Sequence, residues 1–355
     1  ALAACGGTNV VQNASSGAAS ASVQAATSGS VASAPNAASA AGGVPERAQI
    51  TALYGSTSGS MAPLYIAADK GIFQKYGLAS VSVQYAESIT EPAALMAGEA
   101  QIGVDDGASV IQAAVAGAPV KIIATTNKSN PYAIVVRPDI KTAADLKGKT
   151  LALLKPGDTT DISARMALKP YGITVGTDVT ALSVGNSAPR LAALLSGQVA
   201  GALLSEAFVD QAVAQGMHVL VSLEQANIPY ISAGIVTTDS FGKANPNTVL
   251  AYLKATIEAE KYYSDESHQT ESMALLAKYL KTSPDDPNVV NAYKFYHQRL
   301  VHDIYPDKDG ADTILESLKQ IDPQRYGSLT SDAVIDSSFM TTLRNSGFQK
   351  TVWGE

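Results

Sequence analysis

Cysteine is almost absent from this sequence: Cys5 is the only one among 355 residues. Disulfide bonds therefore cannot hold the fold together, and cysteine-based metal or catalytic clusters are excluded. The four histidines, His218, His268, His297 and His302, lack the spacing of a metal site. No nucleophile elbow, phosphate-binding loop or dinucleotide motif occurs. We therefore expect no catalytic residue, no metal and no cofactor.

Basic charge and long apolar runs are also scarce. Acidic residues outnumber Lys and Arg by 32 to 25, which gives a net charge of -7 and no clustered basic stripe, so a nucleic-acid partner is not expected. No stretch approaches about 18 uninterrupted apolar residues, so the sequence predicts no membrane-spanning helix. The hydrophobic fraction of 46% suits a globular protein with a sizeable core.

The first 46 residues differ from the rest in composition. Residues 2–6 read LAACG, which resembles the end of a bacterial signal peptide and its lipobox, with Cys5 as the lipidated residue. We interpret residues 1–5 as this remnant and expect a lipid anchor to a membrane. Residues 6–46 consist mainly of Ala, Ser and Gly with no charge before Glu46, so they are predicted to form a disordered tether.

From residue 49 onward, short apolar runs alternate with helical patterns. Strands are expected at 49–54, 81–85, 102–104, 120–125 and 133–136, with helices between them, and Ser60 is expected to cap the first helix. A second set of strands follows at 150–154, 179–184, 202–204 and 218–222, and long amphipathic helices fill most of the chain after 237. Repeated βα units predict largely parallel sheets covered by helices.

One short sequence motif occurs twice. Residues 93–99 (AALMAGE) resemble residues 192–198 (AALLSGQ), and each copy leads into a small-residue strand. The first strand ends at Asp105 and Asp106, and the second at Ser205 and Glu206. Because open α/β sheets bind ligands at the carboxyl ends of their strands, two such lobes predict a shared cleft.

Several of these stretches resemble one family. Residues 63–73 (PLYIAADKGIF), 76–78 (YGL), 94–103 (ALMAGEAQIG), 145–150 (DLKGKT) and 336–339 (DSSF) are similar to segments of the sulfonate/nitrate/taurine and thiamine-pyrimidine group of type II periplasmic binding proteins, the SsuA/NMT1-like proteins. The resemblance covers about residues 49–348. It departs from the family at Ala200–Ala202, where an Asp is common, and this leaves Glu206 as the nearest acid.

The resemblance implies the α/β, two-lobed type II periplasmic-binding-protein fold, with a helical C-terminal extension on lobe one. Lobe one is expected at 47–137 plus 236–355 and lobe two at 138–235, with crossovers near 137–142 and 222–235. It further implies a monomer that works outside the cytoplasm with an ABC permease and its ATPase, closing on a small molecule.

The candidate ligand-binding residues lie at strand ends, in the two loops that precede helices, and among the tyrosines. They are Ser58, Ser60, Met61, Tyr85, Asp105, Asp106, Asn127, Tyr132, Asp158, Thr159, Thr160, Asn186, Glu206 and Tyr230. Arg165 and Arg190 are candidate anion clamps, although both are expected on solvated helix faces.

The ligand itself stays open between two classes. Fifteen tyrosines and the acidic strand ends favour a flat organic nutrient, such as a pyrimidine-type vitamin precursor or riboflavin. An alkylsulfonate, taurine or nitrate is the alternative. An enzyme related to the thiamine-pyrimidine synthase shares this architecture but depends on a cysteine-rich motif, which is missing after Cys5.

Overall fold

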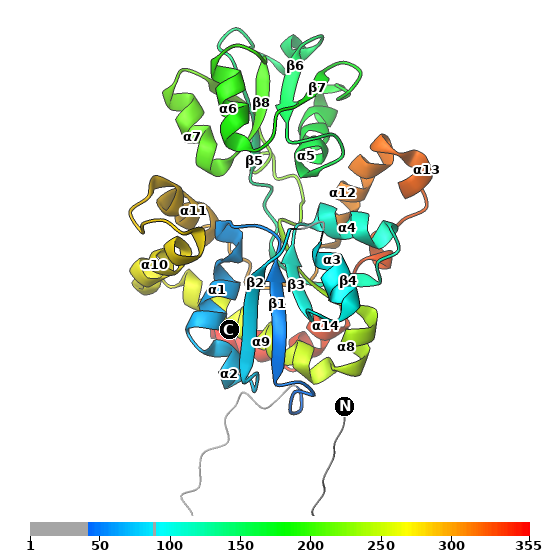
Figure 1. Cartoon of the computed structure of the whole chain (residues 1–355), viewed down its shortest axis with the longest axis vertical. Helices are drawn as coiled ribbons and strands as arrows, with labels where there is room; N and C mark the ends of the chain where they lie inside the picture. The colour runs from blue at the N-terminus through cyan, green and yellow to red at the C-terminus, as the bar shows by residue number, and fades with distance from the viewer. Residues whose placement is uncertain (1–41, 88–89) are drawn as a thin grey trace, which may run out of the picture. The chain divides into compact units, whose positions relative to one another are not determined.

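The computed structural model describes residues 42–87 and 90–355. Two five-stranded sheets form the framework of this part of the chain (Figure 1). The first has the order β2-β1-β3-β10-β4 and the second β7-β6-β8-β5-β9. The bounds are β1 Gln49–Tyr54, β2 Ser80–Tyr85, β3 Ile102–Asp105, β4 Val120–Asn127, β5 Tyr132–Val136, β6 Thr150–Leu153, β7 Thr180–Ser183, β8 Gly201–Ser205, β9 His218–Ser222 and β10 Ala233–Thr238.

Each sheet contains a single strand that runs against the others. In the first sheet, β10 is antiparallel to both β3 and β4, whereas β1 pairs parallel with β2 and β3. In the second sheet, β5 is antiparallel to β8 and β9, whereas β6 pairs parallel with β7 and β8. The prediction of two mostly parallel α/β sheets is therefore confirmed.

The first crossover lies earlier than the sequence indicated. Strand β5 belongs to the second sheet, so the chain passes between the sheets in residues 128–131 rather than near 137–142. The error arose because the apolar run of β5 follows β4 closely, and its pattern does not reveal the direction or sheet of a strand. The return falls between β9 and β10, in residues 223–232, within the expected interval.

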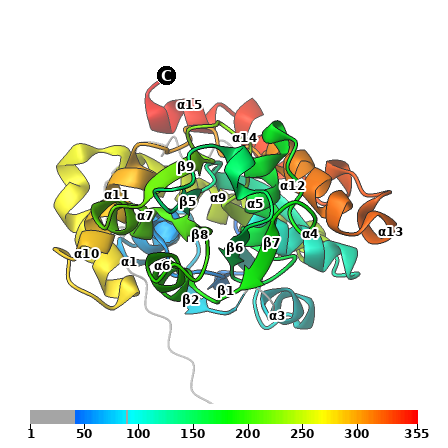
Figure 2. The same ribbon diagram turned by 90° about the horizontal axis from the view of Figure 1, so that it is seen from above.

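Helices cover both faces of the first sheet (Figures 1 and 2). Residues of β1 alternate between two cores: Ile50, Ala52 and Tyr54 belong to one, and Leu53 belongs to the other. The first core contains α1 (Ala62–Asp69), α2 (Ile72–Lys75) and α9 (Pro246–Ser264). The second contains α3 (Glu91–Ala97), α4 (Gly107–Val115) and α12 (Lys308–Ile321). This alternation is what a strand buried on both sides requires.

The second sheet follows the same rule with α5 (Thr159–Leu168) on one face and α6 (Ser187–Leu195) and α7 (Glu206–Ala214) on the other. The remaining helices follow β10 in the chain, as predicted. They are α8 (Asp239–Ala244), α10 (Gln269–Leu280), α11 (Pro287–His297), α13 (Pro323–Tyr326), α14 (Ser338–Asn345) and α15 (Phe348–Trp353). Two helices that follow β10, α11 and α12, contact helices of the second sheet: α11 packs against α7 and α12 against α5.

Of the expected tether, residues 42–46 lie in the described part of the chain, and they contact α9. Gly43 donates its N–H to Asn247 Oδ1 at 2.8 Å, and the Glu46 carboxylate accepts the N–H groups of Asn247 and Thr248 at 3.1 and 2.9 Å. Glu46 therefore caps α9, because its oxygens take up donors that the first helical turn leaves unpaired. Burial raises the Glu46 pKa, but these hydrogen bonds outweigh it and leave the pKa below its usual value. Cys5 and residues 6–41 lie outside the described residues.

Candidate functional site

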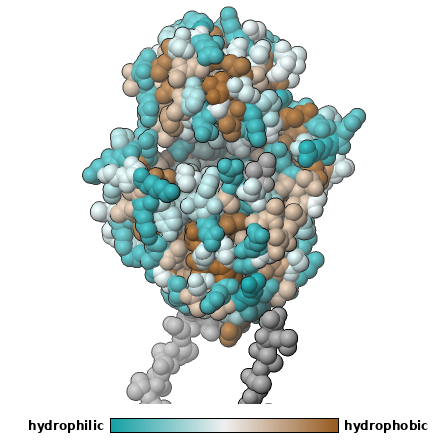
Figure 3. Space-filling model, viewed as in Figure 1, coloured by the Kyte–Doolittle hydropathy of each residue, from teal (hydrophilic) through white to brown (hydrophobic). Residues whose placement is uncertain are grey.

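A cavity of about 1670 Å³ lies where the carboxyl ends of strands from both sheets meet. From the first sheet it is lined by the loop after β1, by Tyr85 and by Asp105 and Asp106. From the second it is lined by the loop after β6 and by Asn186, Ser205 and Glu206. Helices α11, α12 and α13 add further walls. Figure 3 shows the surface hollowed at the level where the two sheets face each other.

The loop after β1 forms the wall nearest to α11. Ser58 caps the short 3-10 turn Gly59–Met61, and its Oγ lies 2.6 Å from Ser60 Oγ. The expected cap, Ser60, is instead part of that turn, because the turn begins before α1. Both serines line the cavity, whereas Met61 is buried against the core. Tyr296 of α11 packs over Gly59, where an added Cβ would lie 2.5 Å from its ring.

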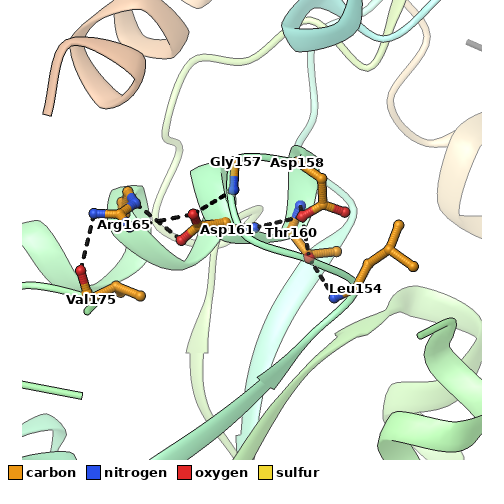
Figure 4. A network of polar contacts seen from close by, with 7 residues as sticks. All are labelled: Leu154, Gly157, Asp158, Thr160, Asp161, Arg165 and Val175. Atoms are coloured by element: carbon orange, nitrogen blue, oxygen red, sulfur yellow. Dashed lines mark hydrogen bonds and ion pairs between the residues drawn. The ribbon is translucent and has the colours of Figure 1, made fainter. Parts of the chain in front are cut away.

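The loop after β6 is held by a network at the start of α5 (Figure 4). Asp158 Oδ1 accepts the N–H groups of Thr160 and Asp161, both at 3.1 Å, and the Thr160 hydroxyl at 2.7 Å. Thr160 Oγ1 in turn accepts the N–H of Leu154 at 2.9 Å. Asp158 and Thr159 line the cavity, but Thr160 does not, because its hydroxyl is used to position the loop. The second oxygen of Asp158 is buried without a hydrogen-bond partner.

Asp106 connects the two sheets. Its Oδ1 accepts the Ala108 N–H at 2.9 Å, which caps α4, and the Thr159 hydroxyl at 3.2 Å, which comes from α5. Its Oδ2 accepts the Tyr230 hydroxyl at 2.6 Å. Burial raises the Asp106 pKa to about 6, although these hydrogen bonds oppose the shift. Tyr230 is fully buried and supports Asp106 from outside the cavity.

Glu206 is the first residue of α7 and faces the same space. Burial raises its pKa to about 7, against the opposing effects of its own backbone N–H and of Arg299. The nearby Tyr132 lines the cavity too, and burial, together with the charge of Asp106, raises its pKa. Carboxyl groups that titrate near neutral pH are a mark of functional sites, so this wall is a candidate ligand contact.

The two arginines do not project into the cavity as clamps. Arg165 pairs with Asp161 at 3.0 Å and donates to the Val175 carbonyl at 3.1 Å (Figure 4). Arg190 was expected on a solvated face, but it is only 2% exposed. Its guanidinium donates to the carbonyls of Leu203 and Gly185 at 2.6 and 2.7 Å and to Ser187 Oγ at 2.9 Å, so it secures β8 to α6.

Most of the predicted ligand contacts meet at this cavity. Those lining it are Ser58, Ser60, Tyr85, Asp105, Asp106, Tyr132, Asp158, Thr159, Asn186 and Glu206, and those behind it are Met61, Asn127, Thr160 and Tyr230. Asn127 is buried, and its Oδ1 accepts the Ser232 hydroxyl at 2.6 Å. Sequence reasoning missed Tyr296, Phe208, Ser232 and Arg325, which also line the cavity.

Within residues 42–87 and 90–355, no helix has the length and apolar character needed to cross a membrane. The same residues contain no group of three or more His, Cys, Asp or Glu side chains placed to hold a metal ion.

The family described as NMT1/THI5 like matches residues 58–269, which is more than half of the sequence. The chain belongs to this family. Its fold is also that of solved binding proteins. These include the periplasmic nitrate-binding protein NrtA of Synechocystis PCC 6803 (20% identity, TM-score 0.65, 86% of this chain and 89% of that one). The aliphatic sulphonate-binding protein SsuA of Escherichia coli is similar (19%, TM-score 0.65, 82% and 93%).

A curated relative, the bicarbonate transport ATP-binding protein CmpC of a Synechocystis strain, is 26% identical over 248 residues. The alignment covers 63% of this chain and 37% of the relative, so this NMT1/THI5-like chain spans well under half of that protein's length. The family match and the shared fold confirm the resemblance seen in the sequence, including the type II periplasmic-binding-protein architecture.

Proposed function

We propose that this NMT1/THI5-like chain is the solute-binding component of an ABC importer and captures one small organic molecule between its two sheets. The observation that carries the proposal is the cavity at the carboxyl ends of strands from both sheets. Ligand bound there touches both halves at once, so binding favours the arrangement in which they are close. A permease and its ATPase are the proposed partners, and the protein is proposed to act as a monomer.

The favoured solute is a flat heteroaromatic nutrient such as a pyrimidine-type precursor or riboflavin. Tyr85, Tyr132 and Tyr296 line the cavity together with Phe208, and aromatic rings of this kind can stack on a flat ligand. The serine hydroxyls of the loop after β1 and the amide of Asn186 add hydrogen-bonding groups.

An alkylsulfonate, taurine or nitrate is the second candidate, and the relatives named for nitrate and sulphonate favour it. We further propose that the protein is extracytoplasmic and lipid-anchored through Cys5, which rests on the LAACG sequence alone. A role like that of the thiamine-pyrimidine synthase, an enzyme on this fold, is disfavoured because the chain has no cysteine after Cys5.

Native mass spectrometry of protein purified from its source tests the proposal by weighing any retained solute. A thermal-shift screen of vitamins, aromatics, taurine and nitrate identifies the class. Retention or stabilisation by one small molecule at one-to-one stoichiometry is expected. If no solute is retained and none in the screen raises Tm, solute capture is refuted.

A further inference from the structure

We infer that the solute carries a positive charge: the cavity is a site for an organic cation with an apolar part. This inference rests on the proposed capture of a solute, and it narrows the chemistry of that solute. It is carried by the charges that line the cavity, by the hydrogen bonds of Arg190, and by the apolar side chains at the rim.

Negative charge dominates the lining. Among the described residues that line the cavity, the acidic ones are Glu87, Asp105, Asp106, Asp158, Glu206 and Asp322, and the basic ones are Lys155 and Arg325. The acids come from both halves: Asp105 ends β3 and Asp106 follows it, whereas Asp158 precedes α5 and Glu206 begins α7. A ligand between the halves therefore meets carboxyl groups on either side.

Arg190 and Arg299 offset only part of this charge, because the pKa values of Asp158 and Glu206 stay raised although these arginines oppose the shifts. Arg190 donates its hydrogen bonds to two carbonyls and a serine hydroxyl. The second oxygen of Asp158 has no hydrogen-bond partner. A buried carboxyl oxygen without a donor is costly, and a ligand with N–H⁺ groups would supply a donor to Asp158.

The surroundings of Glu206 and Asp106 also disfavour binding of an anionic ligand. Glu206 faces Tyr296, Tyr132 and Arg299, and Arg299 is itself paired with Glu224 at 2.6 Å. Asp106 faces Tyr230, Tyr132 and the Thr159 hydroxyl. Two of these carboxyl groups have pKa values raised into the neutral range by burial, and a bound cation lowers such values by favouring the ionised form.

Exposed apolar side chains at the rim of the cavity favour a ligand that has an apolar part beside its charge. Tyr85, Met96 and Leu154 are 54%, 52% and 36% exposed, and all three line the cavity. Tyr85 and Met96 come from the first half, and Leu154 comes from the loop after β6. Apolar side chains left open to solvent at the entrance of a polar cavity fit an aliphatic or aromatic portion of the ligand.

Three isosteric probes test the sign of the charge: benzamidinium, benzamide and benzoate. Isothermal titration calorimetry of each with the whole chain is expected to show benzamidinium binding at least about tenfold tighter than benzoate, with benzamide between them. Equal or tighter binding of benzoate overturns the inference, and so does the absence of measurable benzamidinium binding.

A variant and a pH series add independent readouts. Glu206→Gln removes a carboxylate whose side chain caps no helix, so it is expected to keep its circular dichroism spectrum and to weaken benzamidinium binding about tenfold. Glu99→Gln, at an exposed position outside the cavity, is the control and is expected to change nothing. Between pH 8 and pH 5, protonation of Glu206, whose pKa is about 7, is expected to weaken cation binding about tenfold, as the Gln variant does. Pure pH independence, or tighter binding at pH 5, refutes the inference.

The outcome separates this inference from solute capture itself. If taurine or nitrate stabilises the protein and benzamidinium does not, capture stands and the cationic solute is wrong. If no solute is retained from the source and no compound binds, the proposed function fails first.

Discussion

Replacing Gly103 by alanine is expected to destabilise the protein through a single contact. Gly103 lies in the middle of β3, where a Cβ would be 2.0 Å from Glu91 Oε1 and 2.7 Å from Glu91 Cδ. The backbone cannot yield, because β3 is paired on one side with β1 and on the other with β10. Glu91 has little room either, since it is buried at the start of α3. Overpacking of this kind costs about 2 kcal/mol, which corresponds to a fall in Tm of about 3 °C in a chain of 355 residues.

A double-mutant cycle measured by urea unfolding isolates the cause. Glu91→Ala alone is expected to change the free energy of unfolding by less than about 1 kcal/mol, because it removes a carboxyl oxygen that has no partner. In that background the added methyl group has space, so Gly103→Ala should cost little, with a coupling of about 2 kcal/mol between the two changes. A Gly103→Ala penalty that is as large without Glu91 as with it would falsify the clash.

Three further outcomes follow from other contacts. Gly59→Ala should place its Cβ 2.5 Å from the Tyr296 ring, shift α11 and weaken ligand binding by more than its effect on Tm explains, whereas Gly43→Ala, an exposed position in contact only with Asn247, should do neither. Glu46→Ala should remove the α9 cap and cost about 1 kcal/mol in denaturant unfolding. Because the folded pKa of Glu46 is lowered, this difference in the free energy of unfolding should be present above the unfolded pKa and vanish as pH falls through the folded pKa. Burial without a hydrogen bond raises the pKa of Glu260, so the free energy of unfolding of the wild type should fall as pH rises above the unfolded pKa of this group. In a pH series of unfolding curves, Glu260→Gln should flatten that slope, and an unchanged slope contradicts this account.

The sequence predicted the strands and the cavity well where local chemistry decides them. Strand ends that carry polar groups, such as Asp105 and Glu206, could be located because parallel strands deliver their carboxyl ends to one edge. The N-capping turn before α5 was placed correctly for the same local reason. Family resemblance supplied the two-lobed arrangement, which periodicity alone does not show.

Contacts between distant segments could not be predicted in this way. Tyr296 lies on a helix that the pattern identifies only as amphipathic, and its place over Gly59 depends on how α11 packs. Tyr230 and Thr160 were expected to face the ligand, but their hydroxyl groups form hydrogen bonds within the protein. That of Tyr230 donates to Asp106, and that of Thr160 accepts the N–H of Leu154. Arg190 shows the converse, since nothing in its neighbours along the chain reveals that carbonyls 5 and 13 residues away will bury it.

The strand order has a consequence for how the chain is assembled during synthesis. All strands of the second sheet lie within residues 132–222, so that sheet can be completed from one continuous stretch as it leaves the ribosome. The first sheet cannot be completed from one continuous stretch, because β10, at residues 233–238, is inserted between β3 and β4. Although the first sheet starts earlier in the sequence, the position between β3 and β4 stays vacant until all strands of the second sheet have been made.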